Sequence, residues 1–93
     1  MGFTKESSTR RAKSDLAERL GIKESEISEK GITERDFPDM SLGSAIGGEF
    51  SAQMISSGWA IDLEAGGKHY EYRADKYQIR LHNFRGKNHV IAS

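Results

Sequence analysis

The chain has 93 residues and no cysteine, so it has room for one domain and can form neither a disulfide framework nor a thiolate metal site. No apolar run approaches the roughly 20 residues that a membrane-spanning helix requires, which predicts no membrane span. The net charge is zero, with +3 over residues 1–13, −7 over residues 14–75 and +4 over residues 76–93. Such sparse basic ends disfavour nucleic acid as a partner.

The first predicted element is a helix that follows a flexible lead-in over residues 1–8. The hydroxyl of Ser8 or Thr9 is suited to accept a hydrogen bond from an early helical N–H. Gly21 can take the left-handed conformation that ends a helix. The apolar stripe of this helix consists of Ala12, Leu16, Ala17 and Leu20.

The middle of the chain is less regular. Residues 27–37 form a weak strand in which Ile32 and Phe37 are the best candidates for burial. The segment from residue 38 to residue 58 is rich in glycine and serine, and connections of this length in small domains are functional or mobile. We expect a loop from Pro38 to Glu49. The alternation of apolar residues after it predicts a short fourth strand through Phe50, Ala52 and Met54.

The stretch from Trp59 to Leu81 reads as three antiparallel strands with one solvated face, because apolar residues alternate along it and Tyr77 begins the third set. We therefore expect an α+β fold in which one N-terminal helix packs on an antiparallel meander of about four strands. We expect the domain to span residues 9–84 and residues 85–93 to form a flexible basic tail. The predicted core consists of Leu16, Leu20, Trp59, Ile61, Leu63, Tyr72, Ile79 and Leu81.

No pattern of polar residues indicates an enzyme, a metal site or a cofactor site. The three histidines, His69, His82 and His89, have no spacing that brings three metal ligands together. The serines lack a Gly-x-Ser-x-Gly context. The glycine-rich segment of residues 43–48 lacks the Gly-Lys-Ser/Thr ending of a phosphate loop. Cross-strand charge pairing on the solvated face explains the remaining set, Asp62, Glu64, Glu71, Arg73 and Arg80.

Three blocks resemble a family of short, uncharacterised bacterial domains. They are a helix similar to residues 12–22, the block Phe37-Pro38-Asp39-Met40-Ser41-Leu42-Gly43-Ser44, and two successive strands, Gly58-Trp59-Ala60-Ile61-Asp62-Leu63-Glu64-Ala65-Gly66-Gly67 and Tyr70-Glu71-Tyr72-Arg73-Ala74-Asp75, with Gln53 between the second block and these strands. The resemblance covers roughly residues 10–82. Members of that family often follow a signal or lipoprotein sequence, and the resemblance brings no established activity.

This chain departs from the resembled family at two thiols. The family has a cysteine where Ser44 stands, and the cysteine that often ends its last strand falls near His82. The joint loss is expected if the pair forms a disulfide in extracellular relatives. We therefore expect a soluble protein, cytoplasmic as given and extracytoplasmic if a signal sequence preceded it.

Two classes of function fit these observations. The first is a monomeric, non-catalytic protein-interaction module that presents the loop of residues 38–48 to an unknown protein partner, with a protease as one such partner. Its candidate contact residues are Pro38, Asp39, Ser41, Leu42, Gly43 and Ile46. An equally weighted alternative has Leu42 tucked under the loop, where it closes the open end of the sheet. The second class is a weak nucleic-acid or anionic-surface binder that uses Arg10, Arg11, Lys13, Arg80, Arg85 and Lys87.

Overall fold

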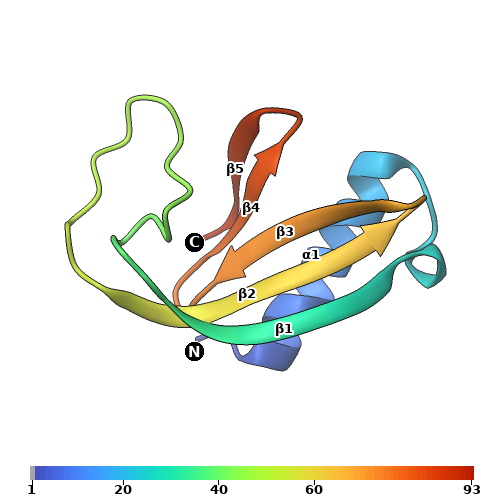
Figure 1. Cartoon of the computed structure of the whole chain (residues 1–93), viewed down its shortest axis with the longest axis horizontal. Coiled ribbons are helices and arrows are strands. Elements are labelled where there is room, and N and C mark those ends of the chain that lie inside the picture. Colours follow the sequence, from blue (N-terminus) through green and yellow to red (C-terminus); the bar gives the residue numbers. More distant parts are fainter. Residues whose placement is uncertain (1) are drawn as a thin grey trace.

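A computed structural model describes residues 2–93 and confirms the α+β fold (Figure 1). A helix, α1 (Lys5–Leu20), and a single turn of 3₁₀ helix (Glu24–Glu26) precede the sheet. The sheet is antiparallel, with five strands in the order β1-β2-β3-β4-β5 rather than about four. These strands are β1 (Ser28–Phe37), β2 (Ser56–Ala65), β3 (Lys68–Ala74), β4 (Ile79–Phe84) and β5 (Lys87–Ala92).

The helix begins earlier than the sequence predicted, because a capping box forms at Thr4. The Thr4 hydroxyl accepts a hydrogen bond from the Ser7 amide at 3.0 Å, and the Ser7 hydroxyl accepts one from the Thr4 amide at 2.9 Å. Ser8 and Thr9, the predicted caps, are buried within the helix and donate to main-chain carbonyls one turn earlier. Residues 5–8 of the predicted lead-in are therefore helical, and residue 1 lies outside the described residues. Gly21 ends the helix with φ 67°, as expected.

One hydrophobic core lies between α1 and the sheet. Six of the eight predicted core residues are fully buried, namely Leu16, Ile61, Leu63, Tyr72, Ile79 and Leu81. The other two, Leu20 and Trp59, are half-buried and pack against the edge of this core. The Tyr72 hydroxyl donates to Asp15 of α1 at 2.7 Å, and burial raises the pKa of that tyrosine. Tyr77 was expected to point inward but is 64% exposed, because β4 begins only at Ile79.

Two expectations about the strands are wrong. Residues 50–54 form no strand, and Phe50 and Met54 are exposed. Residues 87–92, assigned to a flexible tail, form β5 beside β4. The strand forms because Ile91 and Ala92 pack against the core, a contribution hidden in the sequence by the polar Lys87-Asn88-His89 run.

The long connection between β1 and β2 lies on the face of the sheet opposite to α1. In Figure 1 the helix passes behind strands β1–β3, and this loop and the β4–β5 hairpin rise above them. The face predicted to be solvated is therefore partly covered. Within residues 2–93, no helix combines the length and the apolar composition that a bilayer crossing requires.

Candidate functional site

The loop of residues 38–44 is a compact turn organised by one carboxylate. Asp39 Oδ1 accepts hydrogen bonds from the Ser41 hydroxyl, the Ser41 amide at 2.9 Å and the Gly43 amide at 3.2 Å. The hydrogen bond from the Ser41 side chain is the largest of the effects that lower the pKa of Asp39. Asp39 and Ser41 thus shape the loop, a structural role for two of the predicted contact residues.

Leu42 points into the protein and is not offered to a partner. Its side chain is fully buried although its backbone has a left-handed φ of 59°, a conformation that is rare for a branched residue. The neighbouring Ser41 is also buried, whereas Pro38 and Gly43 are exposed. The structure therefore agrees with the alternative in which Leu42 tucks under the loop.

Two arginines of the sheet donate hydrogen bonds to this loop. Arg73 and Arg80 stand directly opposite each other on β3 and β4, and they are only 9% and 5% exposed. Arg73 Nη1 donates to the Leu42 carbonyl at 3.0 Å, and Arg80 Nη1 donates to the Ser44 carbonyl at 3.1 Å. The expectation of cross-strand charge pairs on a solvated face is wrong for both: the loop covers them, Arg73 pairs with Glu71 of its own strand, and Arg80 pairs with Glu49 of the loop. Buried guanidinium groups need such acceptors, and loop carbonyls provide them.

The Arg80 guanidinium also forms a two-point ion pair with Glu49 at the far side of the loop. Arg80 Nη1 and Nη2 each donate to one Glu49 carboxylate oxygen at 2.6 Å. This contact lowers the pKa of Glu49, and the Arg80 side chain is 6% exposed against 22% for Glu49. The loop is therefore fixed to the sheet at two points, the Ser44 carbonyl and the Glu49 carboxylate.

Ser44 and His82, the two positions linked by the resemblance, are in contact. The Ser44 hydroxyl lies 2.9 Å from His82 Nδ1, and Ser44 is fully buried. Burial, followed by the charge of Arg73, lowers the pKa of His82, so the ring is neutral near pH 7. A hydrogen bond thus joins the loop to β4 at this point, and the burial of Ser44 argues against its use as an exposed nucleophile.

The second half of the loop exposes its large apolar side chains. Phe50 is 103% exposed, Met54 63%, Ile55 73% and Ile46 40%. Of the predicted contact residues, only Ile46 belongs to this set. The sequence analysis assigned Phe50 and Met54 to a half-buried strand because of their alternate spacing, and it assigned no role to Ile55. The signal that could have found them is the absence of a neighbouring apolar segment to cover them.

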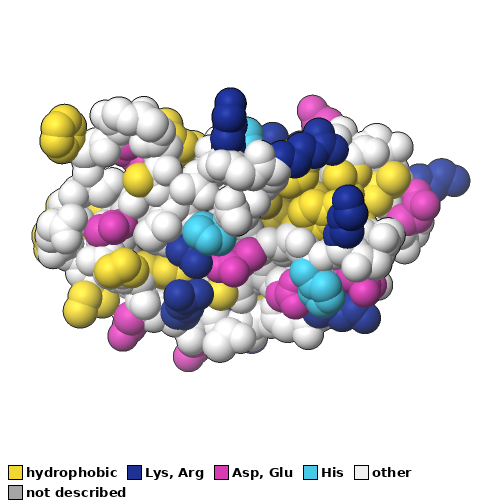
Figure 2. All heavy atoms as spheres, turned by 45° about the horizontal axis from the view of Figure 1, so that its top comes forward, with side chains coloured by type: hydrophobic (Ala, Val, Ile, Leu, Met, Phe, Trp, Pro, Cys, Tyr) yellow, Lys and Arg dark blue, Asp and Glu magenta, His cyan; other side chains and the backbone are white. Residues whose placement is uncertain are grey.

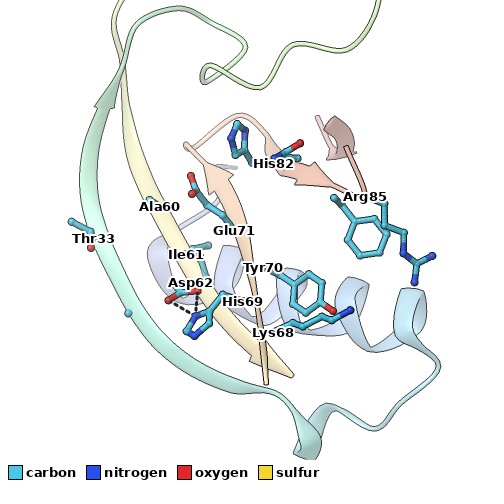
Figure 3. A pocket seen from close by; sticks show the side chains of 13 residues that line it. Thr33, Ala60, Ile61, Asp62, Lys68, His69, Tyr70, Glu71, His82 and Arg85 are labelled. Atoms are coloured by element: carbon cyan, nitrogen blue, oxygen red, sulfur yellow. Dashed lines mark hydrogen bonds and ion pairs between the residues drawn. The ribbon is translucent and has the colours of Figure 1, made fainter. Parts of the chain in front are cut away.

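A groove of about 950 Å³ is lined by residues of strands β1 to β4 and of the turn that follows β4 (Figure 3). Asp62 and His69 face each other across β2 and β3, with His69 Nδ1 3.0 Å from both carboxylate oxygens. Glu71 stands opposite His82 in the register of β3 and β4. In residues 2–93, no three histidine, aspartate or glutamate side chains converge as metal ligands would.

Comparison with known proteins identifies the family of this domain. No curated protein and no solved structure matches the chain. A family model described as a domain of unknown function, DUF8738, matches residues 9–82. That range includes most of the helix, the loop with its arginine contacts, and the strands up to His82. The chain therefore belongs to the DUF8738 family of domains of unknown function.

Proposed function

We propose that this domain is a monomeric, non-catalytic protein-interaction module, and that its contact element is the exposed part of the loop, residues 46–55. This shifts the binding element from the block of residues 38–44, which is anchored, to the segment that follows it. The proposed partner is a protein with an apolar pocket that accepts the side chain of Phe50. Large aromatic side chains that enter a pocket dominate the energy of many protein interfaces.

The observation that carries the proposal is the position of Phe50 between two anchors. On one side Glu49 is fixed by Arg80, and on the other the Ala52 carbonyl accepts a hydrogen bond from the Met40 amide at 3.0 Å. A fully exposed aromatic ring is unfavourable in water, and its anchored neighbours reduce the conformational entropy that binding would remove. Together these features favour a contact residue over a passive connector.

Protease binding is one form that this interaction can take. A protease cleft accepts an extended segment with one side chain in a specificity pocket. A short span held at Glu49 and Ala52 presents Phe50 as an exposed aromatic side chain that a specificity pocket would accept.

The basic ends of the chain give less support to anionic-surface binding. Arg80 is buried against Glu49, so it is withdrawn from the predicted set of basic contacts. Arg10 and Arg11 lie on α1, whereas Arg85 lies at the turn between β4 and β5. Binding through these ends would weaken steeply with salt, whereas insertion of Phe50 into an apolar pocket would not.

The test is an affinity capture from the native lysate with three baits at low and moderate salt. The wild-type domain should retain a partner that Phe50→Ala loses, while both proteins melt at the same temperature because Phe50 is fully exposed. Tyr77→Ala is the matched control, since Tyr77 is an exposed aromatic residue outside the loop. Capture that survives Phe50→Ala, or that Tyr77→Ala abolishes equally, would rule out the loop as the contact element.

A further inference from the structure

The sheet divides at one end, and the groove lies where it divides. β3 pairs with β4 only from Glu71 to Ala74, opposite His82 to Ile79. The first three residues of β3, Lys68–Tyr70, pair with β2 but with no residue of β4. Figure 1 shows the β4–β5 hairpin rising away from this part of β3. A length of strand edge therefore faces the groove in place of a neighbouring strand.

Two aromatic rings form the apolar wall of this groove. Tyr70 and Phe84 have ring centroids 5.9 Å apart and planes inclined by 39°. Both line the groove, and Phe84 also packs in the core. Figure 2 shows a yellow apolar patch on this face, bordered by dark blue basic side chains. The half-buried Tyr70 ring offers aromatic surface to the groove, whereas Phe84 is only 8% exposed and supports that ring from behind.

The groove is lined by two acidic and two basic side chains, and the two acidic ones already have partners. Asp62 is bonded to His69, and Glu71 lies against Arg73 and, at 3.7 Å, Arg35. Both carboxylates are thus already paired. The two remaining charged groups, Lys68 and Arg85, have no ion-pair partner anywhere in residues 2–93.

These two cations lie at the aromatic end. In Figure 3 the Tyr70 side chain projects between Lys68 and Arg85, and Arg85 is 4.8 Å from the centroid of the Phe84 ring. An anionic group bound here would meet both cations while its apolar body rests on the rings. Hydrogen bonds between an ionised donor and a carboxylate are stronger than those between neutral groups.

We propose that this groove binds a carboxylate carried on an apolar or aromatic body. Lys68 and Arg85 hold the carboxylate, and the Tyr70 ring, packed on Phe84, contacts the body. The same chemistry has two sources, a free organic acid or the C-terminal residue of a polypeptide. For the second source, the uncovered edge of Lys68–Tyr70 offers main-chain groups that an extended peptide can bond. This site is separate from the loop tip at residues 46–55.

The test uses amide chemical shifts of the ¹⁵N-labelled domain during titration with 3-phenylpropionate and with its neutral amide. The acid should shift the amides of Lys68, Tyr70 and Arg85 with a Kd of about 1 mM, as expected for a ligand of this size. The neutral amide should bind about tenfold more weakly or not at all. Equal binding of acid and amide, shifts centred on another surface, or no shift at about 10 mM ligand would overturn the proposal.

Variants then test the two cations. Lys68→Gln with Arg85→Gln should weaken binding of 3-phenylpropionate by at least about tenfold without a change in melting temperature, because both side chains are exposed. Lys5→Gln with Lys76→Gln is the matched control, since these two exposed lysines lie outside the groove. An equal loss in the control pair would contradict the assignment and indicate attraction to overall charge.

A peptide pair separates the two sources. Acetyl-Ala-Ala-Phe with a free carboxylate should bind more tightly than 3-phenylpropionate if the strand edge takes part, and equally or less tightly if the natural ligand is a free acid. The peptide with an amidated C-terminus must bind weakly in both cases, and tight binding of that amide would overturn the proposal. Phe50→Ala should leave all these affinities unchanged, so the groove and the loop tip can fail independently.

Discussion

Arg80 of β4 and Glu49 of the loop lie 31 residues apart in the sequence and form a two-point ion pair with both N–O distances at 2.6 Å. The guanidinium is nearly buried and also donates to Gln78 Oε1 at 2.7 Å and to the Ser44 carbonyl. This pair fixes the loop to the sheet immediately before the exposed Phe50. The position of the proposed contact residue therefore depends on a buried cation in the sheet.

Removal of the Glu49 charge should destabilise the domain. Glu49→Gln leaves the buried Arg80 guanidinium without its anionic partner, and we expect a loss of about 1–3 kcal/mol in the free energy of unfolding. The lower part of this range applies if water reaches Arg80 through the partly exposed Glu49 position. Urea unfolding measures the change. Glu34→Gln on exposed β1 is the control, and a loss no larger than that of the control would contradict the role of this pair.

Leu42→Ala should lower stability and leave partner binding intact per folded molecule. Leu42 is fully buried, and removal of such a side chain costs about 2–5 kcal/mol. The measurements are the melting temperature and the affinity for whatever partner the capture experiment yields. Unchanged melting together with lost binding would mean that Leu42 contacts the partner directly, contrary to its buried position.

Gly58→Ala should disrupt the pairing of β2 with β3. A Cβ atom at this position would lie 2.0 Å from the Ala74 carbonyl oxygen, so the main chain would have to move. We expect a loss of at least about 1–3 kcal/mol, the range typical of overpacking. Gly31→Ala on β1 is the matched control, because no atom lies within 4 Å of its added Cβ. The measurement is the melting temperature of each variant. Equal melting temperatures would contradict the close approach of Gly58 to the Ala74 carbonyl.

Acidification should destabilise the domain in two steps. The pKa values of His82, Glu49 and Asp39 are all lower in the folded protein than their usual values of 6.5, 4.5 and 3.8. The unfolded chain therefore binds protons more readily, and the free energy of unfolding falls as the pH falls. His82 contributes the first step, below about pH 6.5, and the carboxylates contribute the second, below about pH 4.5.

Urea midpoints measured across this pH range would resolve the two steps. His82→Gln should remove the first step, and Glu49→Gln should reduce the second. A midpoint in wild type that stays constant from about pH 7 to pH 5 would contradict the assignment to His82.

Local sequence patterns determined the main elements of this protein. The spacing of Leu16 and Ala17 predicted a helix that packs on the sheet, and the alternation around Ile61 predicted the face that β2 buries. Gly21 at the end of the helix followed from its freedom to take positive φ. These features could be predicted because each depends on residues a few positions apart, whose geometry is set by the period of a helix or strand.

Only the tertiary structure decided what covers the second face of the sheet. The alternation that placed Arg73 and Arg80 opposite Tyr72 and Leu81 was correct, but an arginine on that face looks solvated until a distant segment lies over it. Here the loop supplies main-chain carbonyls and Glu49 as acceptors, which allows both guanidinium groups to be buried. The same packing buries Leu42 and leaves Phe50 exposed. The sequence could not predict which of these two apolar side chains would be buried. The physical reason is that hydrogen-bond satisfaction of a buried charge depends on contacts between segments far apart in the chain, which no local period encodes.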